Sequence, residues 1–393
     1  MPEAHDVLHW DARPPRWVVP AACAAIAVGV AGTAWGLAGS HDKTWWMLLV
    51  NFLFWTGLAQ GMVVWSAIFR AAQATWTPAV NRLCHAAVHF LPVSLVFFIL
   101  LSLGREHWLT WLHHPVPEKA AWLNPTFFFR RNGLGLALMT ALSYRYLYLY
   151  RRGEQARTDE EVRDAQYRIN RLAVTLVLLY CVVYSVLAFD LVMSLSPHWT
   201  SSLFGAYFFV TNLYLALAAV IIMASILRRT LALMELLGPR QLTDLGNLML
   251  GFSLLSTGFF FAQYLTIWYG NLPEETSYLI VRTTGAWSPI AWMVLGCCYL
   301  GPFLLLCLPV VKTSPTRLVP VAVLALFGLA VERWVLVVPS LSPGRLAGLG
   351  APQWCIPLGC VGVLLLAVNR SLSRQPSVSS LDVKLELSEG VSL

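Results

Sequence analysis

The sequence has 393 residues, of which 58% are hydrophobic and only 12% are charged, and its mean hydropathy is +0.64. Because a soluble chain carries roughly a quarter charged residues, this composition excludes a soluble globular protein. The net charge of +7 does not indicate nucleic-acid binding, since the Lys and Arg residues lie beside apolar segments, where they act as orientation signals.

Apolar runs of about 20 residues, the length that a helix needs to cross the hydrocarbon of a bilayer, recur along the whole chain. Trp and Tyr residues near the ends of these runs are typical of the membrane interface. We therefore expect an all-α, polytopic membrane protein with about ten transmembrane helices. The predicted spans are 17–38, 45–70, 79–104, 125–150, 169–195, 201–228, 244–269, 285–311, 317–338 and 353–369.

The remaining segments are short. Residues 1–16 are predicted to form a cytoplasmic N-terminal segment, followed by one transmembrane domain over 17–369 whose first span resembles an uncleaved signal-anchor. The charged stretch 151–168 is expected to extend the helices on either side of it into the cytoplasm. Residues 370–393 are rich in Ser and are expected to form a flexible cytoplasmic tail.

The distribution of positive charge predicts the orientation of the spans. With a cytoplasmic N-terminus, 19 of the 27 Lys and Arg residues fall on the cytoplasmic side and eight on the other side. The positive-inside rule then assigns both termini to the cytoplasm. In this orientation the odd-numbered spans run outward.

Asp190 lies near the outer end of the fifth span. A carboxylate within a span is costly unless it is paired or hydrated, so such a residue is a functional candidate by default. One interpretation is a structural ion pair with Arg130, Arg131 or Arg282, which lie at the starts of helices on the outer side. The other interpretation is a role in proton transfer or quinone binding.

Further acidic residues lie near the ends of other spans. Glu274 and Glu275 occupy a tight outer loop before the eighth span, where they either contribute to a site or interact with the helix dipole. Asp244 opens the seventh span on the cytoplasmic side. The ninth span contains Glu332 and Arg333 near its end.

His85 and His89 are four residues apart in the third span, so a regular helix would point both in one direction. They cannot supply the two opposite axial ligands of a single haem. We expect His85 to be hydrogen-bonded within the bundle, and His89, nearer the membrane centre, is a candidate for a proton step. None of the eight Cys residues forms a C-x-x-C motif, so no metal site or haem attachment is predicted. Pro92, Pro289 and Pro302 fall within spans and would kink them.

Several longer motifs resemble one family. They are WLNPTFF at 122–128 followed by Arg130, AFDLVMSLSPHW at 188–199, SSLFGAYFF at 201–209, DLGN at 244–247 and QYLTIWYGNLPEET at 263–276. Together they resemble the ActF-type, NrfD-like membrane subunits of alternative complex III, the bacterial quinol:cytochrome c oxidoreductase. The resemblance covers the spans from about residue 45 to residue 311.

This resemblance implies a bacterial inner-membrane protein with ten helices, eight of them in two four-helix bundles. It implies a sister NrfD-like membrane subunit as a partner, and periplasmic subunits that carry haem c and iron–sulfur centres; a terminal oxidase is a further candidate partner. No cofactor would be covalently bound to this chain. Quinol would be oxidised near the periplasmic face, mainly in the sister subunit, and the membrane subunits would provide proton pathways.

Three functions are compatible with the residues. The first is a quinone-binding or proton-conducting subunit of a quinol-oxidising complex, and the second is a scaffold in the same complex with a degenerate quinone pocket. The third is a secondary transporter, which the low charge near the membrane midplane disfavours. The candidate residues for a quinone site or a proton pathway are Asp190, Glu274, Glu275, His89, Arg130 and Arg282, with His85 and Asp244 on the cytoplasmic side.

Overall fold

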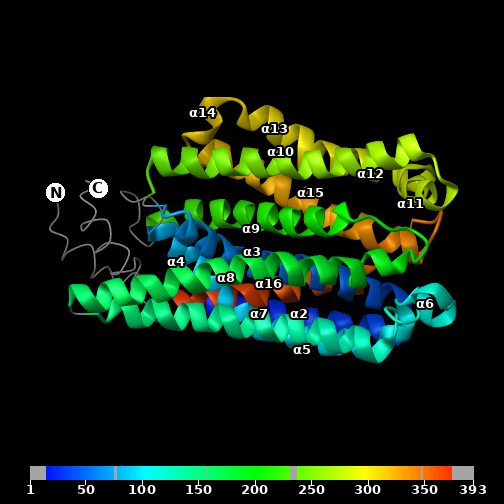
Figure 1. The fold of residues 1–393 in the computed structure, drawn as a ribbon, viewed down its shortest axis with the longest axis horizontal. Helices are drawn as coiled ribbons and strands as arrows, with labels where there is room; N and C mark the ends of the chain where they lie inside the picture. The colour runs from blue at the N-terminus through cyan, green and yellow to red at the C-terminus, as the bar shows by residue number, and fades with distance from the viewer. Residues whose placement is uncertain (1–14, 75–77, 157, 231–236, 347, 374–393) are drawn as a thin grey trace.

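The computed structural model describes residues 15–74, 78–156, 158–230, 237–346 and 348–373 (Figure 1). These ranges are almost entirely helical and contain no β-strand. The predicted N-terminal segment and C-terminal tail lie largely outside them. The long helical segments are α2 Val18–Gly39, α3 His41–Ala71, α4 Pro78–Ala86 continued by η1 Ala87–Phe90 and α5 Leu91–Leu103, α7 Pro125–Glu154, α8 Asp159–Leu191, α9 Leu203–Thr230, α10 Pro239–Gly270, α12 Ser288–Val294 continued by η6 Leu295–Leu300 and α13 Gly301–Leu306, α15 Pro315–Leu341 and α16 Ala351–Leu372.

Each of the ten predicted spans coincides with one of these helical segments. Nine of the described segments are long and apolar enough to cross a membrane. The tenth, α7, has 30 residues but is more polar, because Arg residues occupy both of its ends. It packs along α5 and α8 in the body of the bundle. The chain is therefore an all-α, multi-pass membrane protein.

The helices form two groups of four and one peripheral pair. The first group contains α3, α4–α5, α7 and α8, and the second contains α9, α10, α12–α13 and α15. Helices α3 and α9 pack against each other where the groups meet, and both are largely enclosed by their neighbours. Helices α2 and α16 pair with each other, and α16 lies against α3 and α4. This arrangement agrees with the two four-helix bundles that the family resemblance implies.

Short elements close the two ends of the bundle. At one end, which we call the α11 end, lie α6 Thr110–His113, η4 Met193–Leu195 and α11 Pro273–Thr283 (Figure 1). At the opposite end, α7 and α8 extend beyond the other helices (Figure 1). The expectation that 151–168 extends its flanking helices is confirmed: α8 begins at a capping box in which Thr158 and Glu161 bond each other's backbone N–H groups.

A π-helical turn interrupts the span that contains Pro302. Residues Leu295–Leu300 form this turn, and Pro302 follows it directly in α13. Proline has no N–H to donate, so the carbonyl of Cys298, four residues earlier, lacks its usual helical partner. Tyr214 of α9 donates its hydroxyl to that carbonyl at 3.0 Å. The predicted kink is thus a wide turn that is bonded to the neighbouring helix.

Glycines allow α2 and α16 to approach backbone to backbone. A Cβ atom added to Gly29 would lie 2.4 Å from Cα of Gly359, and one added to Gly32 would lie 2.2 Å from Cβ of Cys355. Such close approach is how membrane helices gain van der Waals contact when burial of apolar surface offers no advantage over lipid.

We expect Gly29→Leu to separate α2 from α16 and to lower the free energy of unfolding by about 1–3 kcal/mol, because the added side chain overlaps main-chain atoms. Thermal unfolding of the detergent-purified protein measures this. Gly258→Leu is the matched control, since Gly258 in α10 has nothing within 4 Å of an added Cβ. Equal melting temperatures for the two variants would contradict the packing described here.

Candidate functional site

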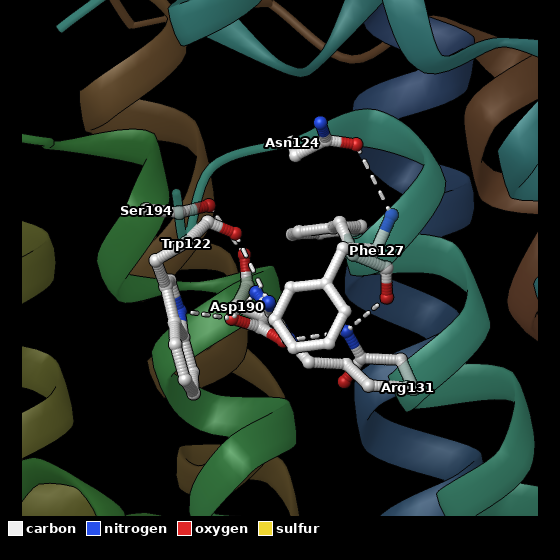
Figure 2. A network of polar contacts seen from close by, with 8 residues as sticks. Trp122, Asn124, Phe127, Arg131, Asp190 and Ser194 are labelled. Atoms are coloured by element: carbon white, nitrogen blue, oxygen red, sulfur yellow. Dashed lines mark hydrogen bonds and ion pairs between the residues drawn. The ribbon is translucent and has the colours of Figure 1, made fainter. Parts of the chain in front are cut away.

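Asp190, at the end of α8, is fully buried and receives four hydrogen bonds (Figure 2). Arg131 binds it with two nitrogens: Nε donates to Oδ2 and Nη2 donates to Oδ1, each at 2.6 Å. Asn132 donates to Oδ2 at 2.6 Å, and the indole of Trp122 donates to Oδ1 at 2.9 Å. Each carboxylate oxygen thus has two donors, and the negative charge lies against a guanidinium.

The partner of Asp190 is itself fixed in place. The Cζ atom of Arg131 lies 4.0 Å from the centre of the Trp122 ring and 4.6 Å from that of Phe127, and its Nη1 donates to the carbonyl of Trp122 at 3.0 Å (Figure 2). The Asn124 side chain caps α7 by accepting from the N–H groups of Thr126 and Phe127. The start of α7 is therefore tied to the end of α8.

Of the three arginines that the sequence offered to Asp190, the structure selects Arg131. Arg130 is exposed, and Arg282 binds other groups. The geometry corresponds to the structural interpretation of Asp190, because its oxygens are saturated with donors and closed off from solvent.

The two histidines do not share one environment. His85 is buried, with its Nε2 atom 2.8 Å from the Ser66 hydroxyl and its ring against those of Tyr146 and Tyr150. His89 is half-buried, and its Nδ1 atom lies 3.3 Å from the Tyr144 hydroxyl. The 3₁₀ turn η1 begins between the two histidines, and both side chains contact tyrosines of α7.

The predicted acidic residues on the second bundle are dispersed. Glu274 is exposed and Glu275 is half-buried, and both lie in the first turn of α11, where carboxylates favour the helix dipole. Asp244 is half-buried near the start of α10. Among the residues that the structure describes, no group of three or more His, Cys, Asp or Glu side chains could hold a metal ion.

The second bundle contains a pocket of about 400 Å³ between α9, α10, α11, α12–η6 and α15. The polar side chains of Gln263, Arg282, Thr283 and Glu332 line it together with an aromatic wall. The aromatic residues are Phe204, Tyr207, Phe260, Tyr264, Tyr278, Trp292 and Tyr299. We call this cavity the aromatic pocket.

Glu332 is the buried carboxylate of the aromatic pocket, with 2% of its surface exposed. Tyr207 donates its hydroxyl to Oε1, and the Tyr299 hydroxyl lies 2.9 Å from that of Tyr207. Because Tyr207 gives its proton to Glu332, Tyr299 is the donor in the second bond. The π-helical turn holds Tyr299, so the irregularity of that span places a hydroxyl in the pocket wall.

Arg333 neutralises Glu332 from the side of α15 that faces α9. It is completely buried, and its Nη1 donates to Oε2 of Glu332 at 2.9 Å. Its Nη2 donates to Thr211 at 2.8 Å and to Asn212 at 2.9 Å. A charge pair and two polar side chains thereby join α15 to α9 inside the membrane bundle.

Arg282 lies at the end of the aromatic pocket nearest the α11 end and is 5% exposed. It donates to the carbonyls of Tyr278 and Leu336 at 2.9 and 3.0 Å and to the hydroxyl of Ser340 at 2.5 Å. Burial lowers the pKa of Arg282 from its ordinary value, and the nearby Tyr278 opposes this shift. Burial likewise raises the pKa of Tyr278, while the charge of Arg282 lowers it.

A second, smaller cavity of about 160 Å³ lies beyond Tyr278 and Arg282, which line both cavities. The exposed side chains of His198 and Glu274 line its other side. The Tyr278 ring stacks on Trp199 with 3.6 Å between ring centres, and the Arg282 guanidinium lies 3.5 Å from the Tyr278 ring centre. These stacked side chains form the wall between the aromatic pocket and the α11 end.

Sequence reasoning selected Arg282 as a site candidate, noted Glu332 in the ninth span without selecting it, and did not single out Tyr207 or Tyr299. A signal for Glu332 was present, because a carboxylate within an apolar span is a functional candidate by the same rule that selected Asp190. Nothing in the sequence pairs Tyr207 with Glu332, which is 125 residues away.

No protein-family model matches this chain, and no curated protein matches it. The resemblance to alternative complex III subunits therefore rests on the motifs alone. The fold and the site define a class: a multi-pass helical membrane protein with an aromatic pocket in its second bundle.

We expect Asp190→Asn to lower the free energy of unfolding by about 3 kcal/mol, because it leaves the Arg131 guanidinium without its counter-charge. Adding Arg131→Gln should cost much less than the sum of the two single changes. A double-mutant cycle on thermal or chemical unfolding measures this coupling. Additive costs would show that the ion pair does not hold α7 to α8.

Proposed function

We propose that this chain is a membrane subunit of a respiratory quinol-oxidising complex and that the aromatic pocket binds the quinone head group. The observation that carries the proposal is a buried, hydrogen-bonded carboxylate, Glu332, in the wall of a largely aromatic pocket. An apolar cavity with a few convergent polar groups is the usual form of a small-molecule site.

The pocket suits a ligand that arrives from the bilayer. Trp292 and Tyr264 line it and are also 69% and 41% exposed on the surface of the transmembrane helices. A lipid-soluble molecule can therefore reach the pocket sideways between α10 and α12. The ring of a quinone would stack on the aromatic walls, a contact that adds to the gain from burial.

The chemistry of quinol oxidation requires groups that accept protons as electrons leave. Glu332 is such a group. The hydroxyls of Tyr299 and Tyr207, which also line the pocket, form a hydrogen-bonded chain that ends on its carboxylate. Arg333 donates to the Glu332 carboxylate, and Asn212 in turn accepts a hydrogen bond from Arg333. Asp190 stays outside this scheme and fixes the helices of the first bundle.

The proposal assigns the electron chemistry to partners. Electrons would pass to haem c and iron–sulfur subunits on the outer side, beside a sister NrfD-like membrane subunit in the bacterial inner membrane. The charge distribution predicts that the α11 end faces outward, and Arg282 and the second cavity lie at that end of the pocket. The alternative is a scaffold role in the same complex, in which the pocket takes no part in quinol oxidation.

We expect Glu332→Gln to reduce quinol turnover by the purified complex at least about 100-fold, since loss of a positioned proton acceptor removes its catalytic effect. Turnover with a long-chain quinol and a soluble one-electron acceptor measures this, and recovery of all subunits verifies assembly. Glu160→Gln, a change of an exposed carboxylate on α8, is the matched control.

Tyr207→Phe provides a second variant that leaves the Glu332–Arg333 pair untouched and should give a smaller loss of turnover. If both variants assemble and turn over at the rate of the unaltered complex, the pocket does not act in quinol oxidation and the subunit is a scaffold.

A further inference from the structure

The aromatic pocket contains a positive charge, that of Arg282, which no acidic side chain of the pocket neutralises. Glu332 and Arg282 are the two charged side chains that line it. Glu332 is already paired with Arg333, at 2.9 Å. Within the described part of the chain, Arg282 has no carboxylate within ion-pair distance, and its acceptors are two carbonyls and a hydroxyl, all neutral.

The other groups that face Arg282 do not remove this charge. Tyr207 of α9, Tyr264 of α10, Tyr278 of α11 and Tyr299 of η6 contribute phenol side chains and no carboxylate. Across the Tyr278 wall, His198 and Glu274 line the second cavity and are exposed to solvent. Glu274 is eight residues from Arg282 on α11, which is about 12 Å along the helix, and water screens a charge at that distance.

Donor groups at this end of the pocket are also left without acceptors. In the described ranges, the buried Nε–H of Arg282 and the buried hydroxyl of Tyr278 have no hydrogen-bond partner. Buried donors are normally satisfied, so each such group points to an acceptor that the protein itself does not provide. An uncompensated cation with spare donors is complementary to an anionic oxygen.

Glu332 and Arg282 both line the aromatic pocket, and a hydrogen bond ties Arg282 to the helix that carries Glu332. Arg282 is bound to α15 at the Leu336 carbonyl, one helical turn or about 6 Å from Glu332. The pocket therefore offers a hydrogen-bond acceptor in Glu332 and a cationic donor in Arg282.

We propose that the pocket selects the hydroquinone monoanion, with its remaining hydroxyl donating to Glu332 and its oxyanion held by Arg282. The O–H bond nearest Arg282 breaks, its electron pair stays on the ring oxygen, and the outer aqueous phase takes up the proton. No electron is transferred in this step. Arg282 thereby prepares the more easily oxidised form of the ligand before any electron leaves, an inference that rests on the proposed quinone site.

Two probes separate anion selectivity from binding itself. The first is a 3-alkyl-2-hydroxy-1,4-naphthoquinone, whose enolate absorbs visible light, and the second is its neutral 2-methyl ether. We expect the assembled protein to bind the enolate at least about tenfold more tightly than the neutral enol of the same probe, which corresponds to a bound pKa at least about one unit below that of the free probe, and more tightly than the ether. Absorbance titration over pH measures both quantities.

Arg282→Gln should abolish the preference for the enolate. Arg282→Lys keeps the charge and should retain most of the preference, which separates the charge from the packing of the side chain. Arg105→Gln, a change at an exposed arginine, is the matched control for net charge. Thermal unfolding shows whether each variant is folded.

The outcomes distinguish the inference from the function on which it rests. If neither probe binds to the unaltered protein, the aromatic pocket is not a quinone site and both proposals fail. If both probes bind equally, or if Arg282→Gln leaves the enolate preference unchanged while the protein stays folded, the quinone site stands and the oxyanion role of Arg282 is overturned.

Discussion

Buried charges in this bundle are held by partners on neighbouring helices, and these partnerships determine how the helices are joined. Asp190 receives four donors from Arg131, Asn132 and Trp122, which attach the end of α8 to the start of α7. Arg333 binds Glu332, Thr211 and Asn212, which attach α15 to α9. Hydrocarbon offers no water to replace these partners, so each buried carboxylate is paired with an arginine inside the protein.

The Asp190 cluster and the Glu332 cluster differ in whether their carboxylate borders a cavity. In the first, both carboxylate oxygens are saturated and the arginine is covered by two aromatic rings, so the charge is enclosed. In the second, the carboxylate forms part of a pocket wall and one of its donors is a tyrosine that is bonded to another tyrosine. An enclosed pair contributes to architecture, whereas a carboxylate beside a cavity can exchange a proton with a ligand.

Departures from regular helix geometry position the second cluster. Pro302 leaves the Cys298 carbonyl without a helical partner, Tyr214 binds that carbonyl, and the π-helical turn places Tyr299 beside Tyr207. Such turns occur frequently at functional sites because they redirect side chains without ending the helix. Here the redirected side chain is Tyr299, whose hydroxyl extends the hydrogen-bonded chain from Glu332 through Tyr207.

The sequence by itself determined the helical class, the positions of ten helical segments and the extension of α7 and α8 beyond the other helices. These features follow from the length of apolar runs and from local capping groups, which are properties of contiguous residues. It offered Asp190 three arginines and could not choose among them, since the choice depends on how α7 and α8 are rotated against each other. It did not predict the 3₁₀ turn between His85 and His89, nor that one would be buried and the other half-buried. The aromatic pocket was decided by the tertiary structure alone: its walls come from five elements between Phe204 and Leu336, and only packing brings a tyrosine of α9 to a glutamate of α15.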